Sequence, residues 1–178
     1  AQIGPLRCAP EDERGAHQGK EHAQHAEEPD VEWADPKVEK ITTEAQRAEV
    51  EAYVEATGRK TERDRQADVK NITGVFTGAY AIHPFTGKKV PVWLGDYVLA
   101  GYGTGAVMAV PCGDQRDYDF AMHFGIDIPN IFADIDISES AYGEKEGRVA
   151  NSDFLDGLSI PEAIKRAVEE IENAGRGK

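Results

Sequence analysis

The hydrophobic positions of this chain are unevenly spread, and the first 36 residues hold few of them. Residues 1–36 contain isolated aliphatic side chains among many acids and three histidines, with neither helical nor strand periodicity. A segment of that composition buries too little apolar surface to offset its conformational entropy. We therefore predict a divergent, disordered or loosely attached segment over 1–36, followed by a single domain over 37–178.

The first helix of this domain is predicted to begin at Thr43. Thr43 and Gln46 have the spacing of a capping box, and Gly58 follows a stretch with helical periodicity. The apolar face of this helix is expected to comprise Ala48, Tyr53, Val54 and Ala56. A second, highly charged helix is predicted over 61–69, where TERDRQAD is typical of a solvated face.

Short apolar runs bounded by turn residues predict strands in the second half of the chain. HPFTGK between two such runs has the composition of a hairpin turn, centred on residues 83–87. The predicted strands cover 74–82, 89–94, 97–102, 106–110 and 126–131. Together with the helices they indicate a mixed α/β fold.

A last helix is predicted from about Ser159 to the residues before Gly175. Ser159 and Glu162 form another capping-box pattern, and Pro161 falls in the first turn, where its missing N–H costs nothing. Gly175 has the residue type that ends a helix in the left-handed conformation.

The most informative stretch is GYGTGAVMAVPCGDQRDYDF, at residues 101–120. It sets a glycine-rich turn before a short apolar strand and then a polar turn that opens a helix. Asp114 is a natural N-cap, and Asp117 lies in the first turn, where negative charge complements the helix dipole. With Arg116 beside them, these carboxylates indicate a site for a small cationic or polar group.

The same helix should bury one face and end at a glycine. Tyr118, Ala121 and Met122 recur at helical spacing and are expected to face the core, and Gly125 suits the C-terminal stop. The preceding GYGTG run lacks the lysine and the serine or threonine of a phosphate-binding loop, and an apolar run follows it. A tight structural turn is therefore favoured on the residues alone.

Composition narrows the classes of function. The 178 residues suit one domain, and the formal net charge of −13 disfavours an autonomous nucleic-acid binder, which would show a basic face. No apolar run is long enough to span a bilayer, so we expect no membrane partner. Cys8 and Cys112 form no disulfide framework or zinc pattern, and a reducing, cytoplasmic setting is expected.

The stretch also carries a resemblance to a known family. GTGAVMAVP followed by DQRDYDF resembles the signature of the editing domain of bacterial-type leucyl-tRNA synthetases, which is inserted in their class I catalytic domain. The similarity extends over roughly residues 38–178. It implies a mixed α/β fold with a barrel-like β-sheet core and surrounding helices. It also implies hydrolysis of the ester that joins a wrong amino acid, such as norvaline or isoleucine, to leucine tRNA.

The resemblance assigns roles to individual residues. It implies that Asp117 binds the α-amino group of the misattached amino acid. For Asp114, the roles of N-cap and substrate ligand are compatible with each other. Met108 and Val110 are expected to line the site for the amino-acid side chain. Each of these residues stands in the matching AVMAVP or DQRD segment.

Further residues complete the implied substrate site. Tyr102 is expected near the entrance of the site, and the turn with Gly103 and Thr104 should line it. Arg116 either pairs with an acid or contacts the terminal nucleotide, and the residues favour neither alternative. A nucleophilic role for Cys112 is disfavoured against a small buried thiol, because no nearby base supports it.

The implied partners are the 3′ end of leucine tRNA and the remainder of the parent synthetase. Water would be the nucleophile, and no metal or other cofactor is implied for this domain. ATP and magnesium are expected only in the parent catalytic domain, because the HIGH and KMSKS motifs of that domain are absent from this chain.

Two departures from the family pattern keep alternatives open. Cys112-Gly113 stand where many members of the family have a histidine. The family's threonine-rich TTRPDT element is not found, since residues 1–36 contain no threonine. The alternative to an active editing domain is a catalytically silent module that binds a tRNA end or a protein. A free-standing acidic interaction protein is the third interpretation.

Overall fold

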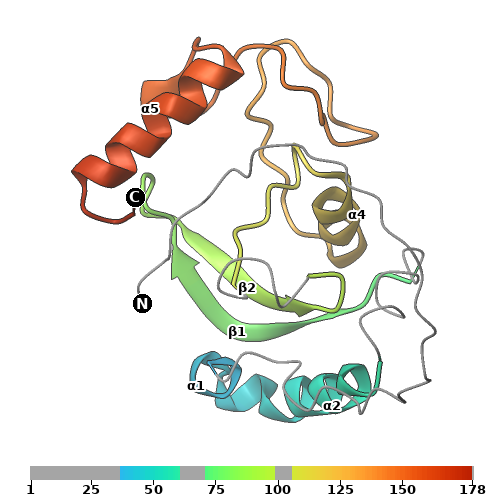
Figure 1. Cartoon of the computed structure of the whole chain (residues 1–178). Helices are drawn as coiled ribbons and strands as arrows, with labels where there is room; N and C mark the ends of the chain where they lie inside the picture. The colour runs from blue at the N-terminus through green and yellow to red at the C-terminus, as the bar shows by residue number, and fades with distance from the viewer. Residues whose placement is uncertain (1–36, 61–70, 99–105, 178) are drawn as a thin grey trace, which may run out of the picture.

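The computed structural model describes residues 37–60, 71–98 and 106–177. Its elements, in chain order, are α1 (Val38–Ile41), the 3-10 turn η1 (Glu44–Gln46), α2 (Arg47–Gly58), β1 (Gly74–Ile82), β2 (Lys89–Gly95), α4 (Gln115–Phe124), the 3-10 turn η2 (Asp153–Leu155) and α5 (Ile160–Asn173). Figure 1 shows a β-hairpin with α1 and α2 on one face and α4 on the other. The predicted segment 1–36, the helix 61–69 and most of the strand 97–102 lie outside the described residues.

The predicted hairpin is confirmed. β1 and β2 pair antiparallel, with Ile82 opposite Lys89 beside the turn. The N–H of His83 donates to the carbonyl of Lys88 at 2.9 Å and closes the connection. The hairpin turn therefore forms at the residues whose types predicted it.

A bulge in the middle of β1 contacts Thr43, the residue that directly precedes η1. The register shifts in this part of β1, and Gly78 adopts a φ of 78°. The neighbouring Thr77 is fully buried, and its carbonyl accepts the N–H of Thr43 at 2.9 Å. The bulge thus fixes the chain that leads into η1.

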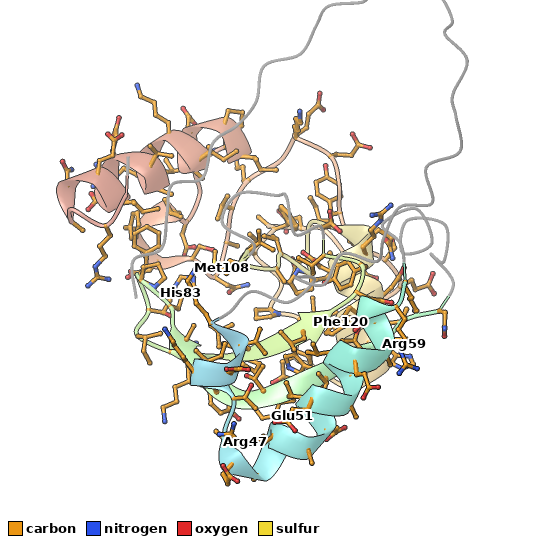
Figure 2. All side chains as sticks on the ribbon, turned by 60° about the horizontal axis from the view of Figure 1, so that its bottom comes forward. Arg47, Glu51, Arg59, His83, Met108 and Phe120 are labelled. Atoms are coloured by element: carbon orange, nitrogen blue, oxygen red, sulfur yellow. The ribbon has the colours of Figure 1, made fainter. Side chains whose placement is uncertain are left out.

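The face of the hairpin that carries Val75 and Leu94 packs against α2. Val50 and Val75 are both buried in one cluster, and Tyr53 and Val54 pack against it. Figure 2 shows the polar side of α2, where Arg47, Glu51 and Arg59 are labelled on the outside of the helix.

The sequence prediction for α2 was right in extent and partly wrong in detail. Ala48 and Ala56 are exposed, and the inward face is built instead by Val50, Tyr53, Val54 and Thr57. The Thr43 side chain makes no capping hydrogen bond, because its hydroxyl faces the β1 bulge and donates to Thr77 O at 3.4 Å. A tertiary partner therefore replaces the local capping box.

Aromatic rings fill the space between the other face of the hairpin and α4. Phe76 and Trp93 face each other across the two strands with ring centroids 5.4 Å apart. Trp93 also contacts Phe124 at 4.8 Å, and Phe124 contacts Phe120 at 4.6 Å. Aromatic contacts of this kind contribute more stability than the burial of their apolar surface alone would give.

α4 begins and ends where the sequence predicts, with a different inward face. Asp114 caps its start, and Gly125 adopts the left-handed conformation at its end. Tyr118 and Ala121 are buried as predicted, whereas Met122 is 59% exposed. The aromatic layer draws Phe120 inward instead, because the hairpin offers Trp93 on that side.

The described residues contain no strand at 106–110 or at 126–131, so both predictions were wrong. Residues 106–110 do not join the hairpin ladder, and the Val110 N–H donates to a side chain. Near 131, the Asn130 side chain binds the backbone of Ile135 and Phe132. The mixed α/β class is confirmed, but the sheet of the described residues is an open two-stranded hairpin rather than a barrel.

The C-terminal part of the chain packs around a second cluster. Cys112, Phe132 and Ile137 are its buried members, joined by partly buried aliphatics from the loops and α5. At the start of α5 the Glu162 carboxylate accepts the backbone N–H of Ser159 at 3.0 Å, which confirms the predicted capping box.

Candidate functional site at the start of α4

The backbone turns sharply before α4 and delivers two carboxylates to its start. The N–H groups of Gly113 and Asp114 both donate to the carbonyl of Val110, at 2.8 and 2.9 Å. Asp114 then caps the helix, since its Oδ1 accepts the N–H groups of Arg116 at 2.9 Å and Asp117 at 3.2 Å. The predicted N-cap is therefore confirmed, and Asp114 itself is exposed.

Asp117 is held by hydrogen bonds from two separate segments. Its Oδ1 accepts the hydroxyl of Tyr97 at 2.8 Å, and its Oδ2 accepts the N–H of Val110 at 2.7 Å. The residue is half-buried in the first turn of α4, where the helix dipole favours a negative charge. Both donors are neutral, so neither offsets a charge on the carboxylate, and the carboxylate oxygens have lone pairs for a further donor.

Tyr97 is the residue at this site that the sequence analysis did not identify. Burial raises the pKa of its hydroxyl well above the usual range, and the hydrogen bond to Asp117 and the charges of Asp117 and Asp114 add to this effect. The phenol therefore stays protonated and remains a donor. Nothing local in the sequence indicated this contact, because Tyr97 and Asp117 are 20 residues apart.

Two apolar residues of the segment before α4 are exposed. Met108 is 56% exposed and Val110 is 42% exposed. The backbone of Val110 contacts Asp117, and the strand that was predicted over 106–110 is absent from the described residues. Figure 2 labels Met108 on the segment that leads toward α4. Of these two residues, Val110 is the one that a hydrogen bond places at Asp117.

The other predicted site residues are placed as follows. Tyr102, Gly103 and Thr104 lie outside the described residues. Arg116 is exposed and forms no ion pair with a described residue. Within the described part of the chain, no group of three or more histidine, cysteine, aspartate or glutamate side chains could hold a metal ion.

Comparison with known proteins identifies the family. The sequence model described as "Leucyl-tRNA synthetase, editing domain" matches residues 32–172. The chain belongs to the leucyl-tRNA synthetase editing domain family. This family edits mischarged tRNA, and its members are parts of aminoacyl-tRNA synthetases that serve protein biosynthesis.

Curated relatives agree with this assignment. The chain is 64% identical over 141 residues to a leucine–tRNA ligase of Christiangramia forsetii, covering 79% of this chain and 15% of the relative. It is 58% identical over 149 residues to that of Flavobacterium psychrophilum, covering 80% and 16%. The leucine–tRNA ligase of Bacteroides thetaiotaomicron is 50% identical over 153 residues, covering 79% and 16%. The chain thus spans about a sixth of the length of these relatives.

Cys112 stands in the turn that precedes α4. Its side chain is buried in the second cluster, and burial raises the pKa of its thiol. A raised pKa keeps the sulfur as a poorly nucleophilic thiol. The prediction of a small buried thiol is therefore confirmed, and Cys112 is no candidate for nucleophilic catalysis.

None of the described helices is both long and apolar enough to cross a membrane.

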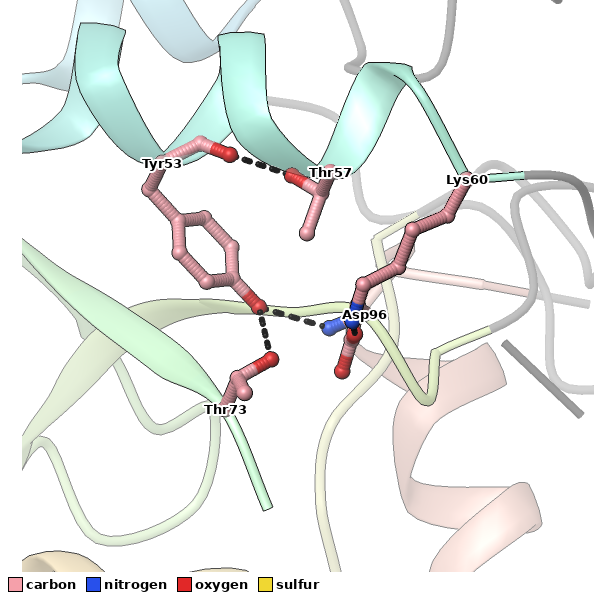
Figure 3. Close-up of polar contacts among 5 residues, drawn as sticks. All are labelled: Tyr53, Thr57, Lys60, Thr73 and Asp96. Atoms are coloured by element: carbon pink, nitrogen blue, oxygen red, sulfur yellow. Dashed lines mark hydrogen bonds and ion pairs between the residues drawn. The ribbon is translucent and has the colours of Figure 1, made fainter. Parts of the chain in front are cut away.

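A polar cluster fixes the end of β2, directly before Tyr97. Asp96 is only 7% exposed, and its carboxylate pairs with Lys60 at 2.8 Å. Its N–H donates to the hydroxyl of Tyr53 at 3.0 Å, and that hydroxyl also bonds Thr73 at 3.0 Å (Figure 3). The cluster connects α2 to the hairpin. Because Asp96 directly precedes Tyr97, the cluster also fixes the backbone position of Tyr97.

The Tyr53 hydroxyl should make the stability of the domain fall at high pH. Burial raises the pKa of Tyr53 to about 12, against about 10 for an unfolded tyrosine. As the pH rises from about 10 to about 12, the unfolded state therefore loses its proton first, and the free energy of unfolding decreases. Chemical denaturation across this range measures the decrease, and Tyr53→Phe should make it shallower. An equal decrease in the variant would assign the effect to other groups.

Proposed function

We propose that this chain carries out post-transfer editing for a leucine–tRNA ligase, hydrolysing the ester between a wrong amino acid and the 3′ adenosine of leucine tRNA. The match to the editing-domain family over residues 32–172 carries this proposal. Norvaline and isoleucine are the proposed substrates. Because a binding site discriminates one methylene by only about 1–3 kcal/mol, a second, hydrolytic selection step has a clear purpose.

In the proposed mechanism, Asp117 binds the α-ammonium group of the substrate. A charge-assisted hydrogen bond of this kind is strong and directional, and the half-buried carboxylate is already oriented by two donors. The exposed side chains of Met108 and Val110 offer apolar contact for the amino-acid side chain. Water attacks the ester carbon, and the adenosine hydroxyl leaves with the proton that water gives up.

Within this proposal the domain uses no cofactor or metal of its own. ATP and magnesium belong to the parent catalytic domain, whose motifs are absent from this chain. The net charge of −13 disfavours strong tRNA binding by the domain alone, so the remainder of the synthetase would hold most of the tRNA. The cytoplasm, where tRNA is charged, is the proposed setting.

A catalytically silent binding module is the second candidate. One observation favours it: residues 1–36 contain no threonine, so they cannot supply the threonine hydroxyls of the TTRPDT element. Such a module would hold the end of a charged tRNA without turning it over.

Incubation of the chain with tRNA carrying norvaline, and separately with correctly charged leucine tRNA, distinguishes the two candidates. An editing domain should release norvaline well above the spontaneous rate and leave leucine attached. Binding of both tRNAs without release above that rate would support the silent module. Release of both amino acids at equal rates would contradict selective editing.

A further inference from the structure

The hydrogen bond between Tyr97 and Asp117 adds a polar contact to the aromatic packing between the hairpin and α4. Tyr97 follows β2 directly, and Asp117 lies in the first turn of α4. The oxygen-to-oxygen distance is 2.8 Å, which is typical for a hydroxyl donating to a carboxylate. Together with the Val110 N–H on the other oxygen, it leaves the carboxylate little freedom to rotate.

The ring of Tyr97 is itself held in place. It packs on Phe120 with centroids 5.3 Å apart, and it lies over Gly95, where a Cβ would come within 2.9 Å of the Tyr97 ring. The residue before it, Asp96, is anchored by Lys60 and Tyr53. The position of the Tyr97 hydroxyl next to Asp117 is therefore fixed by the packing of its ring and by the anchoring of Asp96.

We infer that Tyr97 is a positioning residue for the editing reaction, which keeps the Asp117 carboxylate in the one orientation that receives the substrate ammonium. This inference rests on the proposed function of Asp117. A pre-oriented carboxylate loses less conformational entropy when the ammonium binds, and it holds the ester in a constant place for the attacking water. Tyr97 acts through Asp117 and does not contact the substrate.

The electrostatics are consistent with this role. A tyrosine hydroxyl is a neutral donor at neutral pH, and the raised pKa of Tyr97 extends this state further into the alkaline range. A neutral donor orients the carboxylate without cancelling its charge, whereas a lysine or arginine at this position would compete with the substrate amine. The charge on Asp117 is thus kept for the ligand.

Tyr97→Phe tests the inference, with Tyr118→Phe as the matched control. Both changes remove one tyrosine hydroxyl from a hydrogen bond next to α4, but the Tyr118 hydroxyl donates to Ser138 O at 2.9 Å, away from Asp117. We expect Tyr97→Phe to lower kcat/KM for norvaline-charged tRNA about five- to tenfold, in line with the loss of one hydrogen bond. Tyr118→Phe should match the unchanged chain.

Two further measurements separate positioning from a structural role. With tRNA carrying pentanoate, which lacks the α-amino group, Tyr97→Phe should have no effect on hydrolysis. In an Asp117→Asn background, adding Tyr97→Phe should lower the rate no further, because the two residues act as one unit. Equal losses with both substrates, or additive losses in the double variant, would overturn the inference.

A measurement without turnover keeps the inference testable if the proposed function fails. The amide proton of Val110 reports on Asp117 by NMR, since it donates to Oδ2. Tyr97→Phe should move or broaden this resonance, while Tyr118→Phe leaves it in place. An unchanged Val110 resonance in Tyr97→Phe would show that the hydroxyl does not orient the carboxylate, whatever the chain catalyses.

Discussion

Asp117→Asn should lower the hydrolysis of misacylated leucine tRNA by about one to two orders of magnitude while the domain stays folded. A hydrogen bond to a charged group contributes about 1.5–3 kcal/mol, which corresponds to this loss in rate if the ammonium is bound in the transition state. The fold survives because an asparagine can keep both native partners. Its carbonyl accepts the Val110 N–H, and its NH₂ group donates to the Tyr97 hydroxyl oxygen.

Asp119→Asn is the control for this experiment. Asp119 lies on the same helix and is exposed, and its carboxylate accepts from the Gln115 side chain at 2.7 Å. The same loss of charge at this position should leave both kcat/KM and the melting temperature nearly unchanged. If Asp117→Asn also retained full turnover, Asp117 would be a helix-end carboxylate without a part in substrate binding.

Gly78→Ala should destabilise the domain more than Gly87→Ala in the hairpin turn. Gly78 has a φ of 78°, and a Cβ there would lie 2.0 Å from the Thr43 hydroxyl oxygen. The left-handed backbone costs a non-glycine residue about 1–2 kcal/mol, and overpacking adds about 1–3 kcal/mol. Urea denaturation should therefore show a loss of about 2–5 kcal/mol in the free energy of unfolding.

Gly87→Ala isolates the backbone part of this cost. Gly87 has a φ of 67° in the hairpin turn, and no atom lies within 4 Å of its hypothetical Cβ. We expect a loss of about 1–2 kcal/mol from conformation alone. In a Thr43→Gly background the clash is removed. Gly78→Ala should then lower the free energy of unfolding, relative to Thr43→Gly alone, only by the backbone part of the cost. Equal destabilisation at both glycines would contradict a packed contact between the β1 bulge and η1.

Features that depend on neighbours a few residues apart followed directly from the sequence. The Asp114 cap, the stop at Gly125 and the Ser159–Glu162 box each join atoms within one or two helical turns. The hairpin turn is similarly local, because His83 and Lys88 close it through their own backbones. Such interactions are present wherever the chain segment goes, so residue type and spacing suffice to predict them.

Strands and helix faces could not be settled in this way. The run at 106–110 has the composition of a strand, but a strand exists only where another chain segment supplies a ladder partner, and the Val110 N–H is taken by Asp117 instead. The inward face of α4 likewise depended on Trp93, which favours Phe120 over Met122 as the buried side chain. Hydrophobicity alone does not distinguish these two.

The candidate site divides along the same line. The sequence by itself determined that Asp114 and Asp117 stand at a helix start, since capping chemistry and the helix dipole act within one turn. Only the tertiary structure decided that Tyr97 bonds Asp117 and that Asp96 is buried against Lys60, 36 residues away. Contacts between residues so distant in the chain depend on how the hairpin, α2 and α4 pack, and no local pattern encodes that packing.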